Sequence, residues 1–235
     1  MIFPTTYIDQ SEKAIGDFAA SLSLSKPLNN LITTGTTIVA MINKERKIGI
    51  LASDGRVSGA PFIFDEKFNK VFGCRIGFFA GAGDLSLIQQ IVPAFKLAID
   101  DICDSREKTI SASGASRHLM HYYRAAADEY LKRGMQPQIA FVAIFWDEES
   151  KKIHLYNIES GAILSGKNFL TIGSGFMFVK GQQKVYKDIP ETAEDMIERV
   201  KQEIKMTSEE DAGTNTNVYC SIIDNGEFIP CEKPL

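Results

Sequence analysis

The order of strand-like and helix-like segments is the feature that most constrains the fold of this chain. A β-branched apolar run over residues 36–42 and a second run over 48–53 predict two strands joined by a polar loop at Asn43–Lys47. Strand-like runs over 70–72 and 75–80 follow, with a turn expected near Gly73-Cys74; two helix-like stretches, more strands, two more helices and a closing hairpin come next. Because strands and helices are grouped, antiparallel sheets covered by helices are favoured over a parallel sheet with alternating helices.

Apolar residues at helical spacing mark the predicted helices. Asp84 is the expected N-cap of the first, whose apolar stripe runs from Ile88 to Ile102, and the second is expected from Ser113 to Arg133. The other predicted elements are helices over Phe176–Val185 and Glu191–Met206, strands over 138–146, 152–158, 161–166, 218–224 and 227–231, and a hairpin turn at Asn225-Gly226.

Composition is that of an ordinary globular protein and argues against several functions. The 235 residues suit one large domain with its own core. A net charge of -4 argues against a nucleic-acid-binding surface, and no apolar run approaches the roughly 20 residues that span a bilayer. The N-terminus lacks the basic start and the apolar stretch of a secretory signal. We therefore expect a cytoplasmic protein that binds neither nucleic acid nor membrane.

Cysteine and histidine patterns predict no metal and no cofactor. The four cysteines are widely spaced and match no zinc-site pattern, so they are expected to be reduced thiols. His118 and His121 are three residues apart on a predicted helix, but no third ligand lies near them, and we interpret them as ordinary helix residues.

Charged and glycine-rich segments at strand ends point to a chemical site. Asp54 ends the second predicted strand, and Lys70 enters an apolar strand, where its ammonium is costly to bury without a partner such as Asp54. Small residues in the run GFFAGAG, residues 77–83, leave backbone N–H groups open to a ligand. Taken alone, each charge fits a solvated surface, and Gly35-Thr36 reads as the start of a strand.

Five motifs together resemble a known family. GTTIVAM, ASDGRVSG, KFNKVFG, FFAGAGD and IGSG occur in the order and at the approximate spacing of proteasome β-subunits, above all the bacterial and archaeal kinds, whose prosegment ends in Gly before a Thr-Thr pair. The similarity runs from Gly35 to about Asp224. It implies an N-terminal-nucleophile hydrolase of the α+β class: a four-layer αββα sandwich with two antiparallel sheets packed between helix layers.

The resemblance also implies roles for individual residues. Thr36 matches the catalytic threonine, Lys70 the catalytic lysine, and Asp54 the aspartate that orients it. Gly81 matches the glycine whose N–H stabilises the oxyanion, and Ser174 the serine close to the nucleophile's amine. Asp211 and Thr214 align with an aspartate and a serine of the same network, with Thr in place of Ser.

The chemistry of a terminal threonine explains the first 35 residues. A threonine hydroxyl needs a base, and a free α-amine, with a pKa of about 7.7–8.0, suits that task at neutral pH. While residues 1–35 remain attached, Thr36 has an amide nitrogen and no such base. We therefore expect a prosegment over 1–35, removed by autocatalytic cleavage at Gly35-Thr36, and a working domain over 36–235. Thr33 and Thr34 are rival starts; a mobile tail containing a helix over Ser11–Leu22 and a turn near Pro27 is the alternative.

A substrate pocket is expected beside the nucleophile. The resemblance implies that Phe79 forms its floor, with Val57, Ser58 and Gly83 around it. An apolar, narrowed pocket predicts cleavage after small or medium apolar residues and little after basic ones. The alternative is that Phe79 points into the core.

Partners follow from the resemblance alone. It implies seven-membered rings of β-subunits stacked into a closed barrel, α-type rings, a regulatory ATPase and unfolded proteins as substrates. Two other functions stay open: an unprocessed, catalytically silent ring subunit, and a different N-terminal-nucleophile amidase acting on small amides. The presence of Thr36, Asp54 and Lys70 together favours the threonine endopeptidase over the silent subunit.

Overall fold

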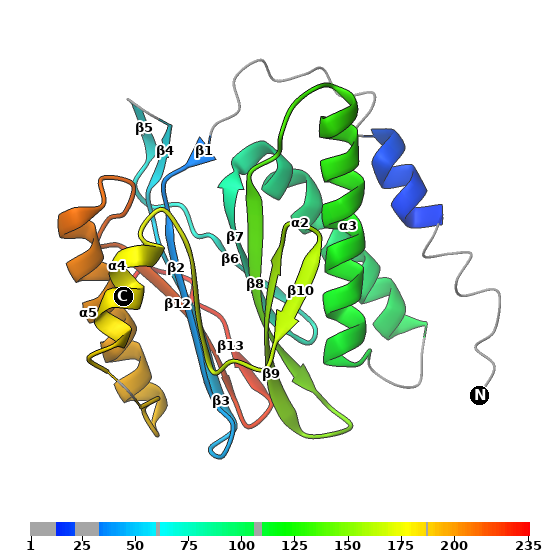
Figure 1. The fold of residues 1–235 in the computed structure, drawn as a ribbon. Helices are drawn as coiled ribbons and strands as arrows, with labels where there is room; N and C mark the ends of the chain where they lie inside the picture. The colour runs from blue at the N-terminus through cyan, green and yellow to red at the C-terminus, as the bar shows by residue number, and fades with distance from the viewer. Residues whose placement is uncertain (1–12, 22–32, 60–61, 106–109, 187) are drawn as a thin grey trace.

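Two antiparallel sheets lie face to face between two layers of helices in the computed structural model (Figure 1), which describes residues 13–21, 33–59, 62–105, 110–186 and 188–235. Helices α2 (Leu85–Asp104) and α3 (Ala112–Lys132) cover one sheet. Helices α4 (Phe176–Gln183) and α5 (Ala193–Glu210) cover the other. The α+β class and the four-layer sandwich predicted from the sequence are confirmed.

One sheet, called here the β2 sheet, carries the first predicted strand at its centre. Its order is β11-β2-β3-β12-β13. Seven successive residues are buried in each of β2 and β3 because one face meets the other sheet and the opposite face meets α5. The strands are β2 (Thr37–Asn43), β3 (Ile48–Asp54), β11 (Phe169–Gly173), β12 (Val218–Asp224) and β13 (Glu227–Ile229).

The other sheet, called here the β7 sheet, is ordered β1-β7-β8-β9-β10, and β6 also pairs with β7. A separate hairpin joins β4 (Val57–Gly59) to β5 (Phe62–Asp65). The strands of the β7 sheet are β1 (Thr33–Thr34), β6 (Val71–Cys74), β7 (Gly77–Asp84), β8 (Ile139–Asp147), β9 (Lys152–Glu159) and β10 (Ala162–Ser165).

Several predicted boundaries move for local reasons. The turn expected at Gly73-Cys74 is wrong: both residues belong to β6, and the hairpin turns at Arg75-Ile76. Ser111 caps α3 by accepting a hydrogen bond from Gly114 N (3.1 Å), so the helix begins before Ser113. Asp84 precedes α2 as predicted, but its carboxylate makes no capping bond and accepts from Gln138 N (2.9 Å) instead.

The C-terminal helices and the short strands also differ from expectation. Thr192 caps α5, which therefore starts at Ala193 and continues to Glu210, four residues beyond the predicted end. Strands β1, β4 and β5 are too short to produce a periodic pattern and were not predicted.

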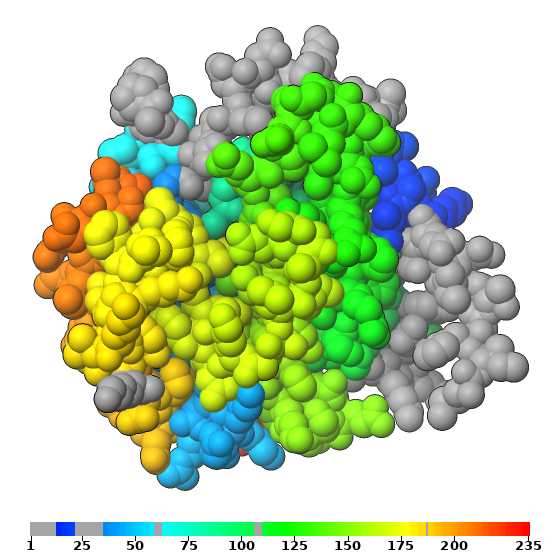
Figure 2. Space-filling view, in the orientation of Figure 1, coloured from blue at the N-terminus to red at the C-terminus, as the bar shows by residue number. Residues whose placement is uncertain are grey.

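A helix over residues 13–21 lies against α3 (Figures 1 and 2). Phe18 is buried there, with its ring edge-on to Tyr122 at 5.2 Å between centroids. This supports the predicted helix over Ser11–Leu22, although its two first residues and its last lie outside the described residues, as does the turn at Pro27.

No helix within the described residues is long and apolar enough to cross a membrane.

Truncation of Phe95 should destabilise the fold. Phe95 is fully buried on the inner face of α2, edge-on to Phe79 at 5.0 Å between ring centroids. Phe95→Ala should lower the free energy of unfolding by about 3–5 kcal/mol because it leaves a cavity. Leu97→Ala is the control on the same helix, since Leu97 is 63% exposed. Urea denaturation checks this; equal losses in the two variants would contradict it.

Candidate active site

Strand register brings candidate residues together at one end of the strands of the β2 sheet. Thr36 immediately precedes β2, which pairs antiparallel with β3 and β11. Thr37 lies opposite Gly173, so Ser174 follows beside Thr36. Ile38 lies opposite Ser53, so Asp54 ends β3 at the same end of the sheet. Because neighbouring strands run in opposite directions, Ser174 meets Thr36 although the two are 138 positions apart in the chain.

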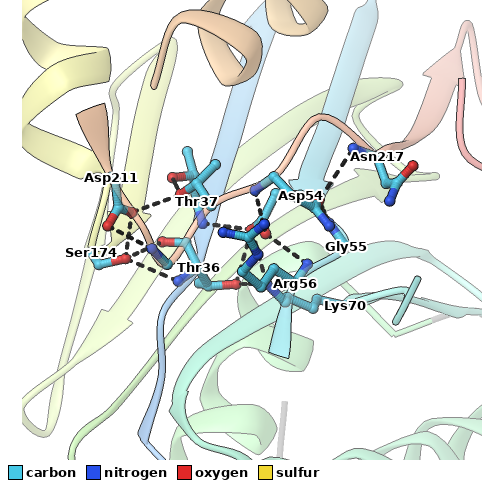
Figure 3. Close-up of polar contacts among 12 residues, drawn as sticks. Thr36, Thr37, Asp54, Gly55, Arg56, Lys70, Ser174, Asp211 and Asn217 are labelled. Carbon is cyan, nitrogen blue, oxygen red and sulfur yellow. Dashed lines mark hydrogen bonds and ion pairs between the residues drawn. The ribbon is translucent and has the colours of Figure 1, made fainter. Parts of the chain in front are cut away.

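Thr36, Asp54 and Lys70 form the centre of the site (Figure 3). All three residues are buried, with exposed fractions of 0%, 0% and 3%. Lys70 Nζ donates to Thr36 Oγ1 and, at 2.8 Å, to Asp54 Oδ1. Thr36 Oγ1 lies 3.2 Å from Asp54 Oδ1, to which it donates. The hydroxyl is thus held between an amine and a carboxylate, as the chemistry of an activated nucleophile requires.

Burial and charge act in opposite directions on Lys70. Burial lowers the pKa of its amine, and the Asp54 carboxylate opposes that shift. Asp54 is itself held by backbone donors: Thr37 N and Arg56 N each lie 2.8 Å from its oxygens. These donors hold the carboxylate against Lys70, whose buried amine needs a partner of opposite charge.

A second network surrounds the backbone nitrogen of Thr36. Thr36 N donates to Ser174 Oγ (3.0 Å), and Ser174 Oγ donates to Asp211 Oδ2 (2.6 Å). Thr214 Oγ1 also donates to Asp211 Oδ2 (2.7 Å) and lies 2.7 Å from Thr37 Oγ1. The structure therefore brings Ser174, Asp211 and Thr214 together near this nitrogen. At position 214 the threonine hydroxyl makes the hydrogen bond to Asp211, although the resemblance implies a serine there.

Gly81 lies at a gap along the edge of β7. On that edge β6 pairs with β7 as far as Ala80, and β1 pairs with it from Gly83. Gly81 and Ala82 are paired in neither ladder, and this gap faces the chain between β1 and β2, which contains Gly35-Thr36. A Cβ at Gly81 would lie 2.9 Å from Phe141 and 3.0 Å from Ile88, so packing behind the strand also requires glycine.

Gly35 passes too close to a second glycine to carry a side chain. A Cβ there would lie 2.4 Å from Gly213 Cα and 2.8 Å from Ser58 Oγ. Gly35 N donates to Ser58 O at 3.3 Å. The residue before Thr36 is therefore fixed by the loop after α5 and by β4.

The four expected substrate residues divide into two groups. Ser58 and Gly83 flank the segment before Thr36 through the contacts above. Phe79 has no exposed surface and packs against Phe95, which is the alternative placement considered for it. A small cavity next to Lys70, without room for a water molecule, is lined by Val57, Phe68, Lys70, Phe72, Gly81, Leu85 and Ile88.

Two residues of the network, Arg56 and Asn215, were missed from the sequence. Arg56 bridges Glu66 and Ala212 O (Nη1 to O 2.7 Å). Asn215 is buried between Gly55 N and Glu66 O. Their signal was weak, because an Arg after a strand and an Asn in a loop occur widely; their closeness to Asp54 and Thr214 in the chain was the only cue.

Metal and thiol chemistry are not indicated in the described part of the chain. It contains no group of three or more His, Cys, Asp or Glu side chains placed to hold a metal ion. The four cysteines are free thiols, and burial raises the pKa values of Cys74 and Cys220 to about 12.

The fold agrees with a comparison against protein families. The family model described as "Proteasome subunit" matches residues 32–223. The chain belongs to the proteasome subunit family. Membership implies assembly with other proteasome subunits in rings and suggests a peptidase.

A double-mutant cycle tests the buried pair. Asp54→Asn should lower the free energy of unfolding by about 3–5 kcal/mol because it leaves the Lys70 amine buried without a counter-charge. Lys70→Met removes that amine, so Asp54→Asn/Lys70→Met should lose clearly less than the sum of the two single variants. Urea denaturation at one protein concentration measures all four proteins. Strictly additive losses would show that the pair is not coupled.

Proposed function

We propose that this chain is a β-type, threonine endopeptidase subunit of a proteasome core, and that it cuts itself at Gly35-Thr36. The observation that carries the proposal is the position of Thr36 Oγ1, between Lys70 and Asp54 and directly after the bond to be cut. Residues 1–35 are then a prosegment and 36–235 the working domain.

Self-cleavage begins with attack of Thr36 Oγ1 on the carbonyl carbon of Gly35. Lys70 accepts the hydroxyl proton, since it contacts Oγ1 and its lowered pKa increases the neutral fraction. The C–N bond breaks, the Thr36 nitrogen takes a proton, and an ester joins Gly35 to Oγ1. Water hydrolyses that ester and leaves a Gly35 carboxylate and a free Thr36 amine.

The freed amine completes the site for other substrates. It remains next to Ser174 Oγ, which Asp211 holds in place. The amine takes protons from the nucleophile, directly or through water, and passes them to the leaving amine. Gly81 N–H, at the gap along β7, stabilises the oxyanion of the tetrahedral intermediate.

The segment before Thr36 supports an extended, unfolded polypeptide as the substrate. Thr33 and Thr34 pair with Asp84 and Gly83 as a short antiparallel strand. A substrate that replaces the released prosegment pairs with the same edge of β7, which requires an extended backbone free of its own structure. A groove whose lining includes Gly83, Gln138 and Ser174 adjoins the site.

Ring partners remain part of the proposal. We infer a ring of β-type copies, heptameric in related subunits, capped by α-type rings and served by an ATPase that delivers unfolded chains. Enclosure of the sites would confine cleavage to such chains.

Replacement of the nucleophile should separate an active from a silent subunit. Thr36→Ala should stop release of residues 1–35 and lower peptide hydrolysis by on the order of 10⁶-fold, because it removes the hydroxyl that contacts both Lys70 and Asp54. Intact mass spectrometry and a peptide assay measure the two effects. Thr33→Ala and Thr34→Ala are the controls and should still give a chain that starts at Thr36. A wild-type chain that keeps residues 1–35 would instead identify a silent ring subunit.

The lining of the cavity beside Lys70 predicts which amino acids precede the bond that is cut in a substrate. Its residues are apolar except Lys70, whose amine would repel a second cation. Cleavage after Ala, Val or Leu should exceed cleavage after Arg or Lys by at least about tenfold in kcat/KM. Phe68→Ala should enlarge the cavity and shift the preference to larger apolar residues. A panel of peptides tests this, and preferred cleavage after Arg or Lys would overturn it.

A further inference from the structure

We infer that Asn215 is a positioning residue of this site: its amide joins three loops and thereby sets the distance between Lys70, Asp54 and Thr36. The inference rests on the proposed function, since it concerns the rate at which Thr36 reacts. Asn215 is 6% exposed and lies just after Asp211 and Thr214.

The amide of Asn215 uses both of its ends. Its Oδ1 accepts from Gly55 N (3.0 Å), which follows Asp54, and from Asn217 N (3.1 Å). Its Nδ2 donates to Glu66 O (2.8 Å) and to the Glu66 carboxylate. One side chain thus ties the end of β3, the loop before β6 and the loop after α5.

The loop before β6 depends on such outside contacts. Its residues, 66–69, are in no helix or strand, and Lys70 follows them directly. Asn217 Nδ2 also donates to Glu66 O (2.7 Å), and Phe68 N donates to Gly55 O (2.9 Å). Lys70 Nζ donates hydrogen bonds to Thr36 and Asp54, so a shift of this loop would move the amine away from the hydroxyl.

Glu66 and Arg56 connect the Asn215 amide to the carboxylate of Asp54. Arg56 pairs with the Glu66 carboxylate (3.1 Å), while Arg56 N and Asn215 N lie 2.8 and 3.4 Å from Asp54 Oδ2. These contacts leave Oδ1 directed at Thr36 and Lys70. Hydrogen bonding from Asn215, followed by pairing with Arg56, lowers the pKa of Glu66, so the bridge carries a carboxylate at neutral pH.

The test compares two buried asparagines. Asn215→Ala should lower kcat by about 10- to 100-fold, because displacement of Lys70 by about 1 Å removes an aligned proton acceptor. KM should change by less than about twofold, since no contact to the peptide is lost. Asn43→Ala is the matched control: Asn43 is also buried and bonded to backbone through both ends of its amide, but it lies at the far end of β2. It should keep the wild-type kcat.

A rescue variant keeps the inference testable if Asn215→Ala does not fold. Asn215→Asp keeps the acceptor for Gly55 N but places a carboxylate against Glu66, and kcat should fall. Asn215→Asp/Glu66→Gln restores a donor and an acceptor across the bridge and should recover at least about tenfold. A rescue in kcat would not follow from loss of general stability.

The outcomes separate the inference from the proposed function. Wild-type kcat in Asn215→Ala, equal loss in Asn43→Ala, or no rescue in the double variant would overturn the positioning role alone. A wild-type chain that never releases residues 1–35, or a Thr36→Ala variant that stays active, would overturn the proposed function and this inference with it.

Discussion

The buried pair of Asp54 and Lys70 is the interaction on which the site depends. Two charges removed from water cost several kcal/mol each unless geometry and hydrogen bonds compensate. Here the compensation comes from separate parts of the chain: Thr36 and Thr37 before and in β2, Arg56 after β3, and Asn215 after α5. The pair is therefore stable only when the start of β2, the end of β3 and the loop after α5 are in place, which links correct folding to formation of the site.

The same geometry explains how the residues of the site can be assembled before the bond between Gly35 and Thr36 is cut. In the uncut chain the segment before Thr36 pairs with the edge of β7, and Gly35 rests against Gly213. Under the proposed function, the bond to be cut and its nucleophile are therefore both held in place, while the nitrogen that would act as the base is still an amide. Activation then changes one bond and needs no rearrangement of the sheets.

Much of the fold was predictable because its strands are long and apolar. The runs that became β2, β3 and β8 have a clear pattern, and Asp54 and Lys70 were paired from the cost of burying a lysine. Roles for Gly81, Ser174, Asp211 and Thr214 came from the resemblance and remain part of the proposal, although the structure brings the last three together. Asn215 and Arg56 could not be found, since their meaning depends on loops that meet only in three dimensions. The orientation of Phe79 could not be predicted either. Strand alternation allows its side chain to point to either face of the sheet, and in the structure it packs against Phe95 in the core.

The central claim is that Thr36 Oγ1 is the atom that attacks the substrate. Its most direct test is to mix the mature protein with a peptide ester, quench the reaction with acid within the first turnover, and locate the acyl group by peptide mass spectrometry. The account predicts one acyl group per active chain, as an ester on Thr36. An acyl group on another residue, or rapid turnover with none trapped on Thr36, would contradict it.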